Sequence, residues 1–473
     1  MVSTKIEGGE MTLSRMLASG VLAGIFGFGV ACAQPENLPK PGGGEPIRAA
    51  VDAFMTPYVE SGNFSGAVLI TSESGVLADA AYGDSVPGYG VANTPRTRFQ
   101  IGSISKTFTA SSILILAQRG FLDLDDPVAR FLPEFPNGEE ITIHHLLSHT
   151  SGLPRFVFQP DYVDRSKRHH TASDLVAWVS ELPTVAPPGE RAAYSNANYA
   201  VLAAIVEQVS GMDYPAFLES EIFGVLGLDD TGLARGAGEI VPGLAAGFQP
   251  VGRTGFEKAR FFDYTSAIGA GAVFSTTHDL NRWYRQLRSG VLLDQDHLRL
   301  LFSRDAAAET YAWRITEFAG HPAVSAQGWD GVGFSGKLLH LEDIDLMVVV
   351  LCNLNVSSIT SEIVDNLASI ALGTEAEMLQ IVTTPGNPND AESLAGIYRF
   401  GPDFYVPNAT IEFVEDQGEL TVNGFQPGAL LRVGEGEFIH RQHWIRVVFE
   451  YDEASRATGI RYGNFRASRE TAG

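Results

Sequence analysis

Apolar runs at the two ends of a long central region predict the strands of one sheet. Residues 66–70 and 75–77 lie near its beginning, and residues 337–341 and 345–351 lie near its end. Residues 363–372, which follow, have the apolar spacing of a helix. Helical and strand patterns alternate between these ends. Strands at both ends with helices between them predict an α+β fold, in which the N- and C-terminal segments of the region share one sheet.

Beyond Ala391 the pattern changes to short runs in which apolar and polar residues alternate, such as 410–414, 419–422 and 445–451. Gly, Asn and Asp separate these runs and favour tight turns. We therefore expect a small antiparallel β domain at 391–473. Residues 34–45 and 383–390 are rich in Pro, Gly or Asn and are typical of linkers, which places the first domain at 46–382.

The N-terminus has the features of an export signal, which we expect at 1–33. Its apolar stretch, residues 16–30, is too short for a membrane span and is followed by Ala31-Cys32-Ala33, an A-x-A-like cleavage site. We therefore expect an exported protein, periplasmic or secreted, with no transmembrane segment in the mature chain. Lipid anchoring at Cys32 is the less favoured alternative, because Gly29 stands where a larger aliphatic residue is usual.

Charge and cysteine content narrow the function further. The 473 residues contain 33 basic and 56 acidic side chains, for a net charge of −23. Such a chain repels phosphate backbones, so we expect no nucleic-acid partner. Cys32 and Cys352 are the two cysteines of the sequence, which argues against a disulfide framework.

The strongest chemical signal lies around Ser103 and Lys106, at the start of a helix predicted from Ser103 to Arg119. The two side chains are three residues apart and so share one face of that helix. Lys106 is the sole charged residue in the stretch 99–118. A desolvated ammonium group has a lowered pKa and can accept a proton near neutrality. Taken alone, the pair is better explained by a Ser that caps the helix and a Lys that extends to solvent.

Two further patterns accompany this pair. Tyr194-Ser195-Asn196 precedes a second helical pattern; its phenol could relay a proton and its amide could hold a substrate carbonyl. Residues 142–153, which contain the run L-L-S-H-T-S-G-L, predict a short helix that ends at a Gly.

Together, S-x-x-K, Y-x-N and L-L-S-H-T-S-G-L resemble the class C β-lactamases, D-alanyl-D-alanine peptidases and β-lactamase-like esterases, over about residues 64–372. The resemblance implies a mixed sheet flanked by helices plus an all-helical lobe, with the site at their junction. It implies that Ser103 attacks a carbonyl, that Lys106 and Tyr194 move its proton, and that Asn196 contacts the substrate. The backbone N–H of Ser103 would be one oxyanion donor.

The third motif of the family, K-T-G or H-x-G, departs from the pattern. Counting back from Gly333-Phe334 places Gln327-Gly328-Trp329 there, with Gln in place of a cation. A Gln cannot pair with a carboxylate as Lys or protonated His does, so neutral substrates are favoured. The Asp330 amide is the expected second oxyanion donor. Trp329 could line the pocket or pack in the core.

Other chemistries have weaker support. No G-x-S-x-G occurs, and the pair His145 and His149 lacks the Glu of an H-E-x-x-H site, so we expect neither metal nor organic cofactor. The leading prediction is a serine hydrolase that acts through an acyl-enzyme on a small-molecule carboxylic ester or amide. Two alternatives remain: a D-amino-acid peptidase or weak β-lactamase acting on peptides or β-lactams, and a penicillin-binding or sensor protein without turnover.

Overall fold

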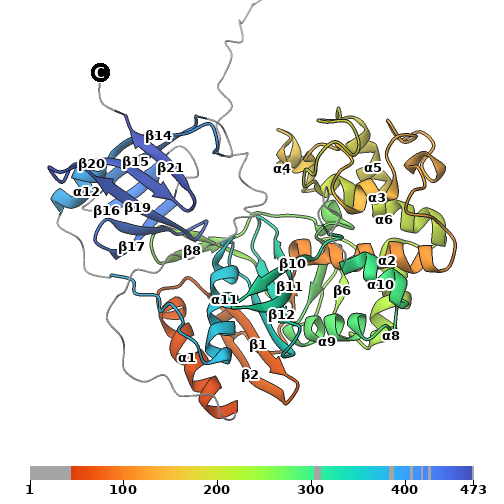
Figure 1. Ribbon diagram of the computed structural model, residues 1–473, viewed down its shortest axis with the longest axis horizontal. Helices are drawn as coiled ribbons and strands as arrows, with labels where there is room; N and C mark the ends of the chain where they lie inside the picture. The colour runs from red at the N-terminus through yellow and green to blue at the C-terminus, as the bar shows by residue number, and fades with distance from the viewer. Residues whose placement is uncertain are drawn as a thin grey trace, which may run out of the picture. The chain divides into compact units, whose positions relative to one another are not determined.

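The computed structural model describes residues 44–302, 310–382, 388–404, 408–416, 419–423 and 428–470. The predicted signal peptide (1–33), the alternative lipid site at Cys32 and most of both predicted linkers lie outside these ranges. The chain divides into two compact units (Figure 1). Among the described residues, the sheet unit comprises those in 44–249 and 257–378, and the barrel unit comprises those in 250–256 and 379–470.

A six-stranded sheet organises the sheet unit and confirms the predicted pairing of N- and C-terminal segments. Strand β1 pairs with β13, so the beginning and end of the unit meet at the centre of the sheet. The fold class is the predicted one, but every pairing in this sheet is antiparallel, where the resemblance implied a mixed sheet. Consecutive strands are joined by short turns, which permit antiparallel pairing and not parallel pairing. The order is β10 (Arg314–Phe318), β11 (His321–Trp329), β12 (Ser335–Leu341), β13 (Leu346–Cys352), β1 (Gly66–Ser72) and β2 (Gly75–Tyr82).

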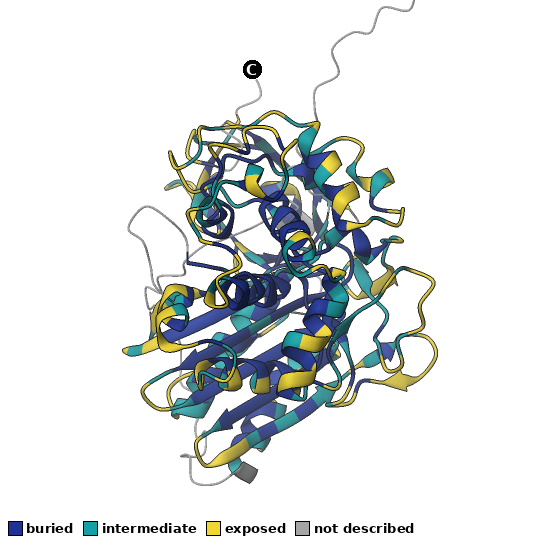
Figure 2. Ribbon diagram, turned by 90° about the vertical axis from the view of Figure 1, so that its right-hand side faces the viewer, coloured by how far each residue is buried: buried dark blue, intermediate teal, exposed yellow. Residues whose placement is uncertain are grey.

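The two faces of the sheet bury different side chains, because successive residues of a strand point to opposite sides. On β13, Met347, Val349 and Leu351 join the main hydrophobic core, which also contains helix α2 (Ser105–Gln118). Helix α11 (Ile359–Leu372) lies on the other face, where Lys337 of β12 binds Asp365 of α11 with an Nζ–Oδ1 distance of 2.6 Å. Helices α1 (Gly44–Glu60) and α11 pack against each other and against strands of this sheet. Figure 2 shows the strands largely buried and the exposed residues gathered in loops and edges.

Helix α2 is the buried axis of the helical lobe. Every residue from Ser105 to Leu116 is buried, so the helix has no solvent-facing side; the hydroxyls of Ser111 and Ser112 donate to carbonyl oxygens of the helix itself. A 3₁₀ turn, η2 (Gly102–Ile104), precedes it, so the predicted helix begins as two elements. Helix α6 (Asn196–Ser210) packs against α2, and α3 (Ile143–Leu147) and α5 (Ala172–Ser180) pack against α6.

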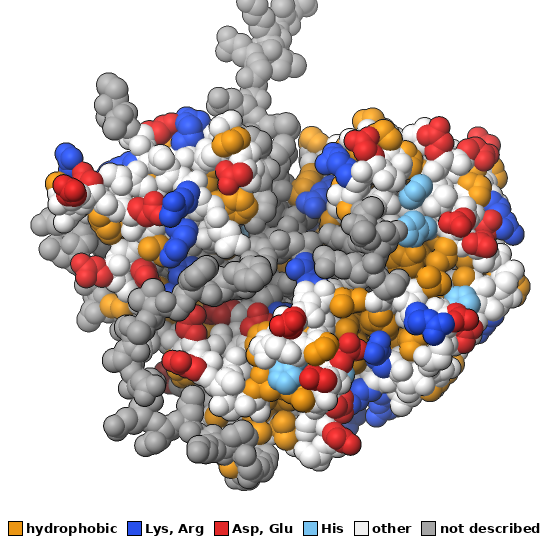
Figure 3. All heavy atoms as spheres, in the orientation of Figure 1, with side chains coloured by type: hydrophobic (Ala, Val, Ile, Leu, Met, Phe, Trp, Pro, Cys, Tyr) orange, Lys and Arg blue, Asp and Glu red, His pale blue; other side chains and the backbone are white. Residues whose placement is uncertain are grey.

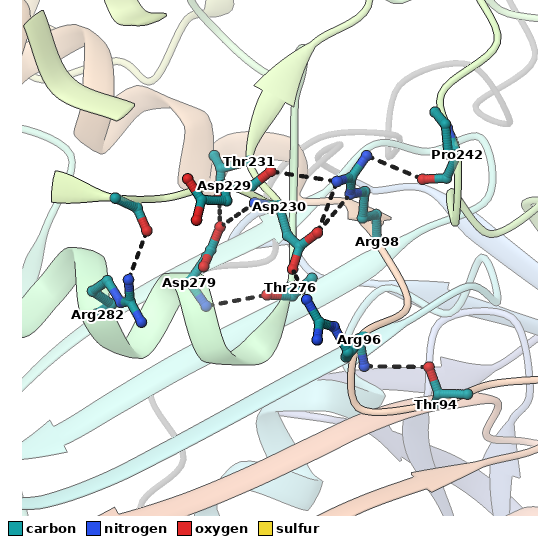
Figure 4. A network of polar contacts seen from close by, with 11 residues as sticks. Thr94, Arg96, Arg98, Asp229, Asp230, Thr231, Pro242, Thr276, Asp279 and Arg282 are labelled. Atoms are coloured by element: carbon teal, nitrogen blue, oxygen red, sulfur yellow. Dashed lines mark hydrogen bonds and ion pairs between the residues drawn. The ribbon is translucent and has the colours of Figure 1, made fainter. Parts of the chain in front are cut away.

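A polar network fixes the strand that leads into η2 (Figure 4). Arg98, just before β5 (Phe99–Gln100), donates to Asp230 Oδ1 at 2.7 Å. The backbone N–H of Asp230 donates to Asp279 at 2.9 Å, in the first turn of α9 (Thr277–Arg288). Burial raises the pKa of Asp279 above its usual value. The network thereby holds the chain in place directly before the Ser103 turn.

Strands β14 to β21 of the barrel unit form a closed barrel in sequence order. Its interior is packed with apolar side chains, among them Tyr398, Phe413 and Phe449. The sequence predicted short antiparallel strands here but not that they close. The strands are β14 (Gly396–Phe400), β15 (Thr410–Asp416), β16 (Glu419–Asn423), β17 (Gly428–Gly434), β18 (Glu437–His440), β19 (Ile445–Tyr451), β20 (Ala457–Tyr462) and β21 (Phe465–Arg469).

Acidic and basic side chains are interspersed over the face drawn in Figure 3, so the excess negative charge is spread out on that face. Cys352 is a buried free thiol, and burial raises its pKa to about 11. Within the described ranges, no helix combines the length and apolarity needed to cross a bilayer.

Candidate active site

Ser103 lies in the η2 turn, where the backbone is packed tightly against strand β11. Gly102 has φ +52°, and a Cβ at this position would lie 2.9 Å from the backbone nitrogen of Trp329. A glycine is therefore required both by the positive φ and by the close approach of the two chains. This packing fixes the position of the Ser103 amide and hydroxyl relative to the edge of the sheet.

Lys106 is buried, with 2% of its surface exposed, and its ammonium nitrogen reaches the nucleophile. Nζ lies 2.9 Å from Ser103 Oγ, 2.8 Å from Asn196 Oδ1 and 2.8 Å from Ala270 O. Burial holds the pKa of Lys106 well below its usual value, because few groups replace the lost water.

The three neighbours of Nζ are oxygen atoms, which fit the three N–H groups of an ammonium and also the two N–H groups and lone pair of a neutral amine. Asn196 Oδ1 and Ala270 O are acceptors, and a neutral amine has two N–H groups to donate to them. Its lone pair is then left for the Ser103 hydroxyl. The arrangement therefore favours Lys106 as a proton acceptor from Ser103 once its pKa is depressed.

Tyr194 completes a triangle with these two residues. Its hydroxyl lies 2.6 Å from Ser103 Oγ, and Lys106 Nζ lies 4.9 Å from the centre of its ring. The Tyr194 backbone is held from outside the triangle, since Arg155 Nε donates to its carbonyl at 2.6 Å. Tyr194 directly precedes helix α6, whose N-cap is Ser195. The structure thus brings together four residues that the sequence singled out, 103, 106, 194 and 196.

Asn196 accepts a hydrogen bond from Lys106 Nζ through its side-chain Oδ1. The sequence assigned this residue to the substrate carbonyl or amide. With Oδ1 engaged, the side-chain N–H groups are what Asn196 offers to a substrate, and these suit a carbonyl oxygen.

Strand β11 presents Ala326 and Gly328 to the Ser103 side of the sheet. A Cβ on Gly328 would lie 1.8 Å from Ile101 O and 3.1 Å from Ser103 N, so no larger residue fits at 328. Ala326, two residues earlier and therefore on the same face, is buried in the same core as Ile101. This face of β11 carries no charged side chain.

The structure corrects the prediction that Gln327 stands in the cation position. Gln327 pairs with Lys337 across the strands, and Lys337 extends to Asp365 of α11, so Gln327 points to that opposite face. Its Nε2 donates to Ser357 O at 3.4 Å. A shift of one residue moves each side chain of a strand to the other face. Counting back from Gly333-Phe334 gave the wrong register.

The Asp330 amide is also not available as the second oxyanion donor. It donates to Phe334 O at 3.2 Å, and Asp330 Oδ1 accepts from the amides of residues 332–334 at 2.8 to 2.9 Å. Asp330 therefore closes the turn between β11 and β12 on itself. The backbone nitrogen that lies across from the Ser103 turn is that of Trp329, beside Gly102.

The Trp329 indole faces away from Ser103, like Gln327. Its Nε1 donates to Asn355 Oδ1 at 2.6 Å, and the side chain is half-buried. This contact supports the packing role that the sequence left open. Gly328 was the signal that could have set the register, because a glycine is the residue that a close backbone approach requires.

Sequence reasoning missed three groups around the triangle: Ala270 O, Arg155 and His149. The first is a backbone atom and carries no sequence signal. His149 lay in the L-L-S-H-T-S-G-L run without an assigned role, and it is buried with its ring centre 4.5 Å from that of Tyr194.

His145, the other member of the His145–His149 pair, makes a structural contact. His145 Nδ1 accepts from Thr142 N at 3.2 Å in a capping box of helix α3. In the part of the chain that the structure describes, no group of three or more His, Cys, Asp or Glu side chains is arranged to hold a metal ion.

Comparison with known proteins places this geometry in a family. Among curated relatives, the putative penicillin-binding protein PbpX of Bacillus subtilis (strain 168) is 29% identical over 257 residues, 54% of this chain and 63% of that protein. The D-alanyl-D-alanine-carboxypeptidase/endopeptidase AmpH of Escherichia coli (strain K12) is 28% identical over 286 residues, 58% of this chain and 69% of that protein. The chain thus spans less than two thirds of PbpX.

Solved structures agree on the fold. The penicillin-binding protein from Bacillus halodurans has a TM-score of 0.59 at 25% identity, covering 68% of this chain and 98% of that one. The D-amino acid amidase from Ochrobactrum anthropi SV3 has a TM-score of 0.60 at 21% identity, covering 69% and 99%. The family model described as Beta-lactamase matches residues 51–369, more than half of the chain. The chain therefore belongs to the Beta-lactamase family of serine hydrolases.

Proposed function

We propose that the protein hydrolyses a small carboxylic ester or amide through an acyl-enzyme on Ser103. The observation that carries this proposal is the triangle of Ser103, Lys106 and Tyr194, with a buried amine 2.9 Å from the serine oxygen and a phenol 2.6 Å from it. A nucleophile within hydrogen-bond reach of a base is the requirement for covalent catalysis.

In the first half-reaction, Ser103 Oγ attacks the substrate carbonyl carbon while its proton moves to Lys106 Nζ. The oxyanion that forms accepts hydrogen bonds from the amides of Ser103 and Trp329. Collapse of this intermediate breaks the bond to the leaving group, which takes the proton from Lys106 by way of the Tyr194 hydroxyl. The products are a free alcohol or amine and Ser103 esterified by the acyl group.

In the second half-reaction, water attacks the acyl carbon and loses its proton to Tyr194 and Lys106. The ester bond to Ser103 then breaks, the serine oxygen recovers that proton, and the carboxylic acid leaves. The same groups act as base in one half and as acid in the other.

The neutral face of β11 favours substrates without a carboxylate in the leaving group. The position that faces Ser103 is Ala326, which offers neither charge nor hydrogen bond. This supports the esterase-like activity. The second candidate is a D-amino-acid peptidase or amidase, because the chain is similar to the D-alanyl-D-alanine-carboxypeptidase/endopeptidase AmpH and to the D-amino acid amidase of Ochrobactrum anthropi.

We further propose that the chain is exported, with cleavage after Ala33, and that residues 46–382 carry the chemistry. The apolar stretch at 16–30 supports the first part. The sheet unit contains Ser103, Lys106, Tyr194 and Asn196, which supports the second part.

Replacing the nucleophile should abolish turnover. Ser103→Ala removes the oxygen that forms the acyl-enzyme, so kcat for a p-nitrophenyl ester should fall at least about a thousandfold. Labelling by a fluorophosphonate probe should also be lost. Ser111→Ala is the matched control, because this buried serine of the same helix donates to Thr107 O. Persistent labelling of Ser103→Ala at another serine would refute the assignment.

Lys106 should set the acidic limb of the pH–rate profile. Its pKa is lowered, so the reactive free amine is present above that depressed pKa and is lost as the pH falls through it. The value of kcat/KM should therefore fall as the pH is lowered through this pKa. Lys106→Arg keeps the charge but cannot release a proton, so the rate should drop by about 10²- to 10⁴-fold at every pH. An Arg variant with wild-type activity would contradict this role.

The register of β11 can be tested with a matched pair of thioesters, one with mercaptoacetate as leaving group and one with its methyl ester. Without a cation on the Ser103 face, the wild type should prefer the neutral thioester by roughly tenfold or more in kcat/KM. Gln327→Lys should leave that ratio unchanged, since residue 327 faces α11. Equal rates on both substrates in the wild type would overturn the neutral preference, and a narrowed ratio in Gln327→Lys would overturn the register.

A further inference from the structure

His149 binds the segment that carries Tyr194 through both its backbone and its side chain. Its carbonyl accepts from Ala193 N at 2.8 Å, and its Nδ1 accepts from Ser195 N at 3.2 Å. Nδ1 also lies 3.0 Å from Asn198 Nδ2. The imidazole is 2% exposed and its ring lies against that of Tyr194, so these contacts surround the Tyr194 residue on the side away from Ser103.

A chain of hydrogen bonds fixes which ring nitrogen carries the proton. The amide of Leu153 donates to Ser151 Oγ at 3.0 Å, and Ser151 Oγ donates to Asn198 Oδ1 at 2.5 Å. Asn198 therefore turns its NH₂ group to His149. Since Nδ1 faces two donors, Asn198 Nδ2 and Ser195 N, it must carry a lone pair, and the ring hydrogen is on Nε2.

The surroundings keep this ring neutral. Burial lowers the pKa of His149 well below its usual value, and the positive charge of Arg155 lowers it further. The aromatic rings that face His149 are those of Tyr194 and Tyr199, which are uncharged partners. Protonation would replace the acceptor at Nδ1 with a donor and break both hydrogen bonds.

We propose that His149 is a positioning residue: as the neutral Nε2–H tautomer, it holds the 193–198 segment so that the Tyr194 hydroxyl stays in contact with Ser103 Oγ. This rests on the proposed function. His149 does not itself exchange a proton with the substrate; it acts through Tyr194. Its backbone supports the role, because the residue adopts φ +58° after helix α3 and so turns the chain back toward α6.

Two substitutions distinguish the contribution of the His149 Nδ1 acceptor from that of the aromatic ring. His149→Asn places Oδ1 where Nδ1 was and tolerates a positive φ, so it keeps the acceptor without the ring. His149→Phe keeps an aromatic ring of similar packing and removes the acceptor. Misplacement of the phenol by about 1 Å should lower kcat about a hundredfold in His149→Phe with little change in KM, and His149→Asn should stay within roughly tenfold of wild type.

The pH profile distinguishes positioning from proton transfer. His149→Asn should retain the acidic limb of the wild type, because His149 does not titrate in the reaction. A limb that disappears in this variant would make His149 the titrating base and overturn the proposal, as would wild-type kcat in His149→Phe. The melting temperature of each variant shows whether it folds. If His149→Phe does not fold, the pH–rate profile of His149→Asn still separates the two roles. A retained acidic limb supports positioning, and a lost one supports proton transfer.

The tautomer can be read in the wild-type protein by ¹⁵N NMR of labelled histidines, assigned by the signal missing from His149→Asn. A pyridine-type Nδ1 and a pyrrole-type Nε2 are expected, and the reverse assignment would overturn the proposal. Fluorophosphonate labelling of Ser103 serves as the independent check. Without labelling in the wild type, the proposed function fails; with labelling but no slowing in His149→Phe, the positioning role fails and the proposed function stands.

Discussion

The burial of one amine against one hydroxyl is the constraint on which the rest of the site depends. Lys106 occupies the all-buried helix α2 and meets Ser103 Oγ at 2.9 Å. A charged ammonium there would lose hydration without a carboxylate in return, which shifts the balance to the neutral form. The acceptors Asn196 Oδ1 and Ala270 O fit the two hydrogens of that neutral form. The proposed chemistry follows from this protonation state.

Two close backbone contacts fix the position of the Lys106 amine and the Ser103 hydroxyl relative to strand β11. Gly102 and Gly328 let the Ser103 turn and strand β11 touch through their main chains. On the other side, Arg155 and His149 hold the Tyr194 segment through its carbonyl and neighbouring amides. The three reacting side chains thus come from two stretches of chain, the η2–α2 junction and the segment just before α6, and each is held by contacts outside the triangle. Rigid support of this kind is what a proton relay requires.

Local sequence signals predicted the helix face of Ser103 and Lys106, because spacing by three residues along a helix needs no tertiary information. The pairing of the first and last strands also followed from the pattern. Gln327 was misplaced because the turn after β11 is closed by Asp330 in a way that the distance to Gly333-Phe334 does not reveal. The closure of the C-terminal barrel and the role of Ala270 O depend on backbone geometry, which side-chain patterns do not encode.

The central claim is that burial lowers the pKa of Lys106 so that it can act as a base, and its titration can be observed directly. The chain has six lysines, so ¹³C NMR of protein labelled at lysine Cε gives few signals, and Lys106→Arg identifies the one from Lys106. The account predicts that this signal titrates well below the ordinary lysine range. A Lys106 signal that titrates within the ordinary lysine range would contradict the account.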